Sequence, residues 1–217
     1  MADRLKAGVL ASKTGSNLLN LIHLSTEGKL LADIVAVASN KTDCGAIRIA
    51  IEHGIPVGRF PIRSYESVEQ RDNAMAKFLQ DHGVELVVLA GYDRVLSVNF
   101  VRQFEGRIIN LHPSLLPAFA GTMHAIEQAF DEGVKVSGVT VHFVTEDVDR
   151  GPIILQKAVP VLEDDTVESF TERIHKTEYE LLPMAINLIA QQRVFICDKK
   201  VRILGGDKNG ITESSSI

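Results

Sequence analysis

Short apolar runs alternate with longer amphipathic segments over the first half of the chain. The apolar runs are Lys6–Ala11, Ala32–Ala38, Ile55–Phe60, Val84–Leu89 and Arg107–Leu111. Continuous apolar runs are typical of strands that are covered on both faces, because helices then shield each side of the sheet. The segments between them predict helices over Ser16–Glu27, Asp43–His53 and Ser64–Gly83. This order indicates an α/β fold with a doubly wound, mostly parallel sheet.

The regular alternation of predicted strands and helices ends after residue 111. A helix is predicted over Thr122–Glu132, followed by two strands, Val136–Val144 and Pro152–Val161, with only a short turn between them. Such a pair fits an antiparallel addition to one side of the sheet. A long helix over Thr166–Gln191 and a hairpin-like segment over Val194–Leu204 complete the pattern. We expect residues 1–205 to form a single domain and residues 206–217 to be a flexible tail.

Composition and charge narrow the class of protein. The 217 residues are 45% hydrophobic and 24% charged, which is the usual mix of a soluble globular protein. The net charge of -5 and the lack of a basic stripe argue against a nucleic-acid partner. No apolar stretch reaches the roughly 18 residues of a membrane span, and no signal peptide is evident. We therefore expect a cytoplasmic protein with no membrane partner.

The two cysteines, Cys44 and Cys197, have no metal-ligand or redox spacing, and each is expected to be a buried thiol in a reducing compartment. No group of His, Cys and Asp has zinc spacing, so no metal is predicted. No serine lies in a nucleophile-elbow context. His142, on an alternating strand, is interpreted as a packed or edge histidine. His23, His53 and His82 lie near helix C-termini, where a cation is favoured.

Three polar features lie at predicted strand ends, where an open α/β sheet binds ligands. The first is the segment A-S-K-T-G-S-N from Ala11 to Asn17. Gly15 permits a tight approach, and Ser16 and Asn17 offer N–H groups at a helix N-terminus, which suits a phosphate. The segment is neither a Walker loop nor a dinucleotide fingerprint. An equally good alternative is that Ser16 only caps the helix.

The second feature is N-L-H-P, with Asn110 and His112 two residues apart. On an extended strand their side chains point the same way, and Pro113 restricts the backbone that follows. Two such hydrogen-bonding groups could polarise a carbonyl and stabilise an oxyanion. The alternative, slightly favoured from these residues alone, is that His112 caps its own strand through a backbone contact.

The third feature is the acidic turn between the two later strands. Acidic turns are usually solvated, but Asp149 precedes Gly151 and Pro152, which restrict the conformation of the turn. Its carboxylate could therefore face His112. An Asp–His pair would raise the pKa of the imidazole and favour its charged form.

Two long motifs resemble a known family. N-L-H-P-S-L-L-P-A-F-A-G (Asn110–Gly121) and G-V-T-V-H-F-V-T-E-D-V-D-R-G-P-I-I (Gly138–Ile154) are similar to the phosphoribosylglycinamide formyltransferases, folate-dependent enzymes of purine synthesis. The resemblance extends over Lys6–Arg193 and includes T-G-S-N-L, A-S-N-K and V-V-L-A-G-Y-D-R-V-L-S. It implies a Rossmann-like formyltransferase fold. It also implies formyl transfer from 10-formyltetrahydrofolate to the amine of glycinamide ribonucleotide, without a metal.

The resemblance also implies roles for residues. Asn110 and His112 would stabilise the oxyanion at the formyl carbon, and Asp149 would keep His112 charged and help to move a proton. Glu178, which helical spacing alone would place on the surface, would contact the ribose. The phosphate would bind Thr14, Gly15, Ser16 and Asn17. The folate would lie against Arg94, Val95 and Leu96 and against the turn that contains Val144, Thr145, Glu146 and Asp147.

The chain departs from the family pattern at several positions. Lys13 stands where many members have a glycine. The lysine would be strained if that position needs a positive φ; alternatively, the lysine amine adds a contact to the phosphate. Asp93 replaces an apolar residue, often Met, in one wall of the folate slot. The segment Thr122–His124 differs from some members, and His124 is given no catalytic role.

Three other functions compete with this interpretation. Formyltetrahydrofolate deformylase shares the motifs but hydrolyses the donor, normally has an additional N-terminal domain, and reads H-H-S where this chain reads H-P-S. Methionyl-tRNA formyltransferase would need an RNA-binding domain and a basic surface. A non-catalytic folate or nucleotide sensor would not need Asn110, His112 and Asp149 together. The partners expected are glycinamide ribonucleotide and folate, with the protein a monomer or homodimer.

Overall fold

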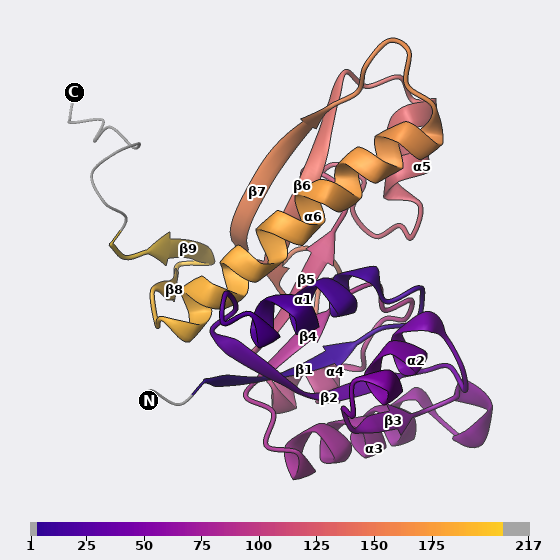
Figure 1. The fold of residues 1–217 in the computed structure, drawn as a ribbon, viewed down its shortest axis with the longest axis vertical. Helices are drawn as coiled ribbons and strands as arrows, with labels where there is room; N and C mark the ends of the chain where they lie inside the picture. The colour runs from indigo at the N-terminus through magenta and orange to yellow at the C-terminus, as the bar shows by residue number, and fades with distance from the viewer. Residues whose placement is uncertain (1–3, 206–217) are drawn as a thin grey trace.

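A seven-stranded sheet forms the centre of the computed structural model, which describes residues 4–205 (Figure 1). Its strands are β1 (Leu5–Leu10), β2 (Ala32–Ser39), β3 (Val57–Arg59), β4 (Leu86–Leu89), β5 (Ile108–His112), β6 (Val136–Phe143) and β7 (Ile153–Pro160). They lie in the order β3-β2-β1-β4-β5-β6-β7. The first five strands are parallel, whereas β6 is antiparallel to β5 and β7 to β6. The predicted mostly parallel sheet with an antiparallel addition is confirmed.

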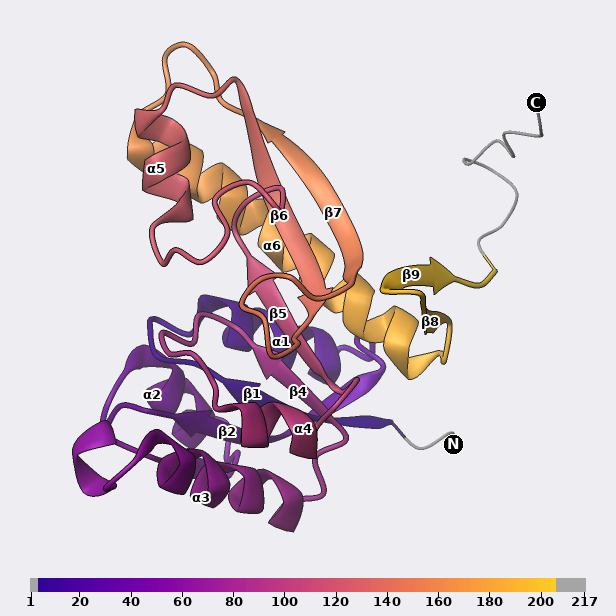
Figure 2. The ribbon, with the colours of Figure 1, turned by 180° about the vertical axis from the view of Figure 1, so that it is seen from behind.

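Helices cover both faces of the sheet. On one face lie α1 (Ser16–Thr26), α2 (Gly45–Glu52), α5 (Ala125–Asp131) and α6 (Val167–Ala190). On the other face lie α3 (Val68–Asp81) and α4 (Val98–Gln103), which Figure 2 shows in front of the sheet. A short 3-10 turn, Ile62–Ser64, links β3 to α3. The doubly wound arrangement follows from the apolar strands, because each of their faces needs a helix to cover it.

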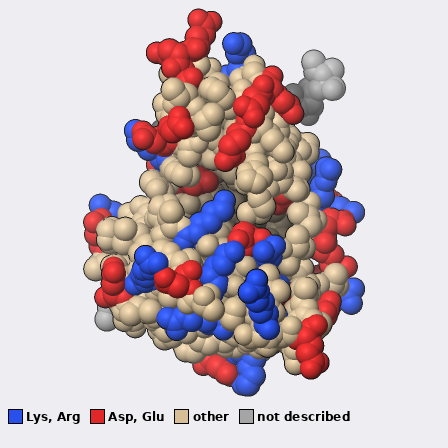
Figure 3. All heavy atoms as spheres, turned by 90° about the vertical axis from the view of Figure 1, so that its right-hand side faces the viewer, with Lys and Arg blue, Asp and Glu red and all other residues tan. Residues whose placement is uncertain are grey.

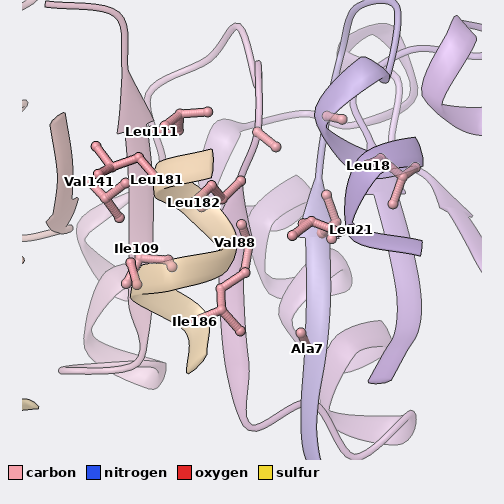
Figure 4. Close-up of a cluster of buried hydrophobic side chains, with 14 of the residues drawn as sticks. Ala7, Leu18, Leu21, Val88, Ile109, Leu111, Val141, Leu181, Leu182 and Ile186 are labelled. Carbon is pink, nitrogen blue, oxygen red and sulfur yellow. The ribbon is translucent and has the colours of Figure 1, made fainter. Parts of the chain in front are cut away.

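The core that holds the strand ends in place is drawn in Figure 4. Leu18 and Leu21 of α1 and Leu182 and Ile186 of α6 pack on the sheet, where strand residues such as Val88 are fully buried. Truncating one such side chain to alanine typically costs about 2–5 kcal/mol, because a cavity remains. The strand ends that carry polar side chains therefore rest on a rigid support.

Several helix boundaries differ from the sequence predictions. The third helix begins at Val68 rather than Ser64, because the Ser67 hydroxyl accepts a hydrogen bond from the Gln70 N–H and caps it there. The helix predicted from Thr122 begins at Ala125. The six-residue α4 was not predicted, since it is too short for a clear periodic pattern.

The predicted hairpin is confirmed as β8 (Val194–Cys197) paired antiparallel with β9 (Lys200–Ile203). The expectation of two buried thiols is wrong, since Cys197 is exposed on this hairpin and Cys44 is only partly buried. The flexible tail predicted for residues 206–217 lies outside the described residues. Between residues 4 and 205, no helix is both long and apolar enough to span a membrane.

Candidate active site

A cleft of about 550 Å³ opens at the carboxyl ends of the parallel strands. The chain leaves β1 toward β2 on one side and returns to β4 on the other, so the strand order reverses at this point. Figure 3 shows this face of the molecule, which is hollowed, with Lys and Arg side chains gathered along the lower edge of the hollow. The cleft is lined by all three polar features of the sequence, by the segment after β4 and by α6.

The loop after β1 forms one wall of the cleft. Gly15 has φ 82° and precedes the first residue of α1, and a Cβ at Gly15 would lie 2.6 Å from the Cα of Ala46. Both facts explain why only glycine fits there. The Ser16 side chain makes no capping hydrogen bond, so the capping alternative is wrong. Lys13 is not among the residues with a positive φ, so its side chain is not strained by the backbone.

Asn110 and His112 both line the cleft from β5, as their spacing predicts. The antiparallel register places His142 of β6 opposite Asn110. His142 Nδ1 lies 2.8 Å from the Phe143 carbonyl, to which it donates, and in the neutral form of the ring Nε2 is then an acceptor. The Asn110 amide nitrogen lies 3.2 Å from that Nε2 and therefore donates to it. His142 thereby fixes the orientation of the Asn110 amide.

His142 is thus a site residue that sequence reasoning missed. It is fully buried, as expected of a packed histidine, but it also lines the cleft. The signal that could have found it is the strand pairing, because a residue on β6 opposite Asn110 must share its face of the sheet.

Asp149 lies close to both β5 residues of the site, Asn110 and His112, and to His142 of β6. Its φ of 53° lies in the left-handed region, which Asp tolerates better than most residues. Its Oδ2 accepts the Gly121 N–H at 2.8 Å and lies 3.5 Å from His112 Nδ1. Its Oδ1 lies 3.3 Å from the Asn110 amide nitrogen and 3.6 Å from His142 Nε2. The carboxylate therefore faces His112, as predicted from the turn.

The ionisation of this cluster differs from expectation. Burial alone would raise the pKa of Asp149, but the His142 ring, the Gly121 N–H and His112 together lower it to about 2. Burial lowers the pKa of His112 and outweighs the opposing effects of Asp149 and the Phe119 carbonyl. The expectation that Asp149 raises the pKa of His112 above its usual value is therefore wrong. Asp149 is therefore ionised at neutral pH.

The second ring nitrogen of His112 also has a partner. Nε2 lies 2.9 Å from the carbonyl oxygen of Phe119, which belongs to the loop after β5. His112 thus makes a backbone contact, as the capping alternative expected, but with the loop after β5, and its ring also faces Asp149 in the cleft. The loop carbonyl lies near one ring nitrogen and the Asp149 carboxylate near the other.

Glu178 of α6 points into the cleft and is 6% exposed. The surface position indicated by helical spacing is wrong, because α6 packs against α1 at this point. Asn17 Nδ2 donates to Glu178 Oε2 at 2.9 Å, and Asn17 Oδ1 is buried without a partner among the described residues. Burial raises the pKa of Glu178 to about 7, although Asn17 and Lys13 oppose the shift. This corner can both donate and accept hydrogen bonds at neutral pH.

The predicted folate-binding residues divide into two groups. Arg94, Val95 and Leu96 line the cleft on the segment after β4. Three of the four turn residues also line it: Val144, Thr145 and Glu146. Asp147 does not.

His175 and Thr171 of α6 line the cleft as well and were not predicted, since a helix in the last third of the chain carries no motif around them. Residues 4–205 contain no group of three or more His, Cys, Asp or Glu suited to a metal ion.

The fold and the cluster at the strand ends define a doubly wound α/β protein with a polar, preorganised cleft of the kind that group-transfer enzymes use. The chain belongs to the formyl transferase family, because the sequence model of that family matches residues 5–186.

Individual relatives agree with this assignment. The chain is 41% identical to the phosphoribosylglycinamide formyltransferase of Bacillus subtilis (strain 168), over 83% of this chain and 92% of that protein. It is 43% identical to the trifunctional purine biosynthetic protein adenosine-3 of Gallus gallus over 88% of its length, but it spans only 19% of that relative. The crystal structure of glycinamide ribonucleotide transformylase 1 from Symbiobacterium toebii aligns with a TM-score of 0.91 and 43% identity, covering 94% of this chain and 96% of that one.

Proposed function

We propose that the chain transfers the formyl group of 10-formyltetrahydrofolate to the primary amine of glycinamide ribonucleotide, in purine biosynthesis. The observation that carries the proposal is the contact of Asp149 with His112 and Asn110 inside a cleft whose other wall is a glycine-containing loop at a helix N-terminus. The cluster supplies an anion and polar N–H groups for acyl transfer. The loop supplies N–H groups for a phosphate.

The ribonucleotide would bind between α1 and α6. Its phosphate would accept hydrogen bonds from the backbone of Thr14, Gly15, Ser16 and Asn17, with Lys13 adding a cation. The ribose hydroxyls would pair with Glu178 and with the unpartnered Oδ1 of Asn17, since a buried acceptor needs a donor. His175 also lines the cleft, and burial, with a smaller contribution from Lys13, lowers its pKa. A bound phosphate dianion would reverse the effect of Lys13.

The folate ring would bind between the two remaining walls. The segment Arg94–Leu96 supplies apolar contacts and backbone groups, and residues 144–147 supply the opposite wall. A slot of this kind suits a flat heterocycle with several donors and acceptors. Asp147, which does not line the cleft in this structure, would contribute through its backbone position in the turn.

The proposed chemistry is direct attack of the amine on the formyl carbon. A carbon–nitrogen bond forms while the carbonyl electron pair moves to oxygen, and Asn110 and His112 stabilise the resulting oxyanion through N–H groups. Collapse of this tetrahedral species breaks the bond from the formyl carbon to N10 of the folate. One proton passes from the attacking amine to N10, with Asp149 as the intermediate base, directly or through water. A neutral amine is already a nucleophile, so no Ser or Cys is needed.

The N–H groups used in this step have internal partners before substrate binds. Asn110 donates to His142 and Asp149 over 3.2 and 3.3 Å, and His112 Nε2 contacts the Phe119 carbonyl. The two bonds of Asn110 are long, so a developing oxyanion, which is a stronger acceptor, can take over an N–H at small cost. Donor binding would displace the Phe119 carbonyl from His112.

An assay of donor consumption tests the proposal. Purified protein should consume 10-formyltetrahydrofolate when glycinamide ribonucleotide is present and release formylated ribonucleotide in equal amount. Donor turnover with water alone would instead assign the chain to the deformylases. Binding of either substrate without turnover would support the non-catalytic sensor.

The cellular setting is part of the same proposal. Both substrates are small cytoplasmic anions, and a chain with two unpaired cysteines fits a reducing cytoplasm. A monomer or a homodimer is compatible with this proposal.

A further inference from the structure

A closed ring of hydrogen bonds joins the loops that follow β1, β2 and β4. The Ser12 hydroxyl donates to Asn40 Oδ1 at 2.5 Å, and Asn40 Nδ2 donates to Asp93 Oδ1 at 2.8 Å. The Asp93 N–H then donates back to the Ser12 oxygen at 3.1 Å. Ser12 and Asn40 are buried, so these bonds are shielded from water. The Ser12–Asn40–Asp93 ring therefore holds three strand-end loops at fixed separations.

A lysine completes the environment of Asp93. Lys41 Nζ lies 2.8 Å from Asp93 Oδ2, so both carboxylate oxygens have partners. Burial opposes ionisation of Asp93, but hydrogen bonds from Lys41 and Asn40 lower its pKa. Asp93 also lines the cleft. An apolar residue, often Met in the family that the sequence resembles, could not make any of these side-chain bonds.

The ring lies between the two proposed subsites. The residue after Ser12 is Lys13, where the phosphate loop begins, and the residue after Asp93 is Arg94, where the folate wall begins. The far end of that wall is anchored separately, because buried Asp72 accepts the Ser97 N–H at 2.6 Å. Asp93 is thus the point at which the folate wall is tied to the phosphate loop.

We propose that Asp93 is a positioning residue that couples the two substrate subsites, so that binding of one substrate tightens binding of the other. The inference rests on the proposed function. Ordering one loop also orders the loop tied to it, so the second ligand loses less conformational entropy when it binds. The coupling is reciprocal, as thermodynamic linkage requires. It is a property of this chain, because it depends on the carboxylate at position 93.

Calorimetric titration of the full chain tests the coupling. The probes are glycinamide ribonucleotide and tetrahydrofolate, which cannot react because no formyl group is present. In the parent protein, saturating ribonucleotide should lower the Kd of tetrahydrofolate by roughly fivefold or more, within the usual range of coupling. Asp93→Met keeps the backbone N–H bond to Ser12 but loses the carboxylate's bonds to Asn40 and Lys41, so the ratio of the two Kd values should fall toward one. Asp93→Asn and Lys41→Met, which retain the ring but lose the ion pair, should give intermediate ratios.

A matched control is Lys77→Met, which removes an exposed ion pair with Asp81 on α3 and should leave the ratio unchanged. A purely structural role of Asp93 would lower Tm without changing the ratio of the Kd values, so both Tm and the ratio are measured.

A ratio of one in the parent, or an unchanged ratio in folded Asp93→Met, overturns the inference. If Asp93→Met does not fold, unchanged ratios in Asp93→Asn and Lys41→Met overturn it equally. If neither ligand binds the parent, the proposed function itself fails, which is distinct from loss of coupling with both ligands bound.

Discussion

His112 Nδ1 and Asp149 Oδ2 lie 3.5 Å apart, although one residue ends β5 and the other lies in the turn between β6 and β7. The antiparallel register places the end of β6 beside the start of β5, and the turn that follows brings Asp149 back to Asn110 and His112. The contact pairs a charged carboxylate with an imidazole whose protonation burial disfavours. A reaction that develops charge at His112 can use this pair.

Replacing either member of the pair should remove most of the activity. We expect His112→Ala and Asp149→Asn each to lower kcat by roughly 10²–10³-fold, the usual cost of losing an oxyanion donor or a proton acceptor. Steady-state kinetics with both substrates measure this. His124→Ala is the control, because His124 is exposed and outside the cleft lining. Near-parent kcat in His112→Ala would remove His112 from the oxyanion site.

His142 should act on the reaction through Asn110. His142→Phe deletes the acceptor that orients the Asn110 amide, so we expect kcat to fall by roughly fivefold with little change in either KM, as loss of about 1 kcal/mol implies. His142→Gln, which can offer an acceptor to Asn110, should restore part of the rate. Equal loss in both variants would mean that the ring only fills space.

Glu178 should make stability depend on pH. Its pKa is about 7 in the folded protein against 4.5 as the ordinary value, so the folded state binds more protons between these values. The free energy of unfolding should therefore decrease as pH rises from 4.5 to 7, by on the order of 3 kcal/mol. Glu178→Gln should abolish this decrease, so that the variant is more stable than the parent at pH 8 and similar to it at pH 4.5.

Urea unfolding at the two pH values measures the effect. Glu180→Gln, on the same helix but exposed, is the matched control and should keep the pH dependence of the parent. Parallel curves for Glu178→Gln and the parent would show that Glu178 is charged in the folded state. Glu178→Gln should also raise the KM for the ribonucleotide, because the buried carboxylate faces its binding corner.

Lys13 should contribute to binding of the phosphate. Since the backbone at Lys13 does not need glycine, Lys13→Gly should gain nothing in strain and should raise the KM for glycinamide ribonucleotide by roughly two- to fivefold, as expected for an exposed ion pair. The effect should shrink at high salt. Lys29→Gly, beyond the other end of α1, is the control. A rise in the KM for the folate donor instead would place Lys13 in the folate subsite and contradict its assignment to the phosphate.

The sequence by itself determined the fold class and which side chains of β5 line the cleft. Apolar runs of strand length need cover on both faces, which dictates a doubly wound sheet, and the two-residue spacing of Asn110 and His112 places them on one face of β5. These are local properties, so periodicity reports them. Short α4 and the start of α3 at Val68 were missed, because a six-residue helix and the Ser67 cap depend on contacts that periodicity does not encode.

Only the tertiary structure decided the environment of each side chain. Register between β5 and β6 brought His142 to Asn110, packing of α6 on α1 buried Glu178, and the loops after β1, β2 and β4 converged on Asp93. Burial also reversed the expected shift in the pKa of His112, since desolvation depends on every neighbour in space. Sequence spacing fixes which way a side chain points along its own element. The residues that a side chain contacts depend on segments that are distant in the sequence.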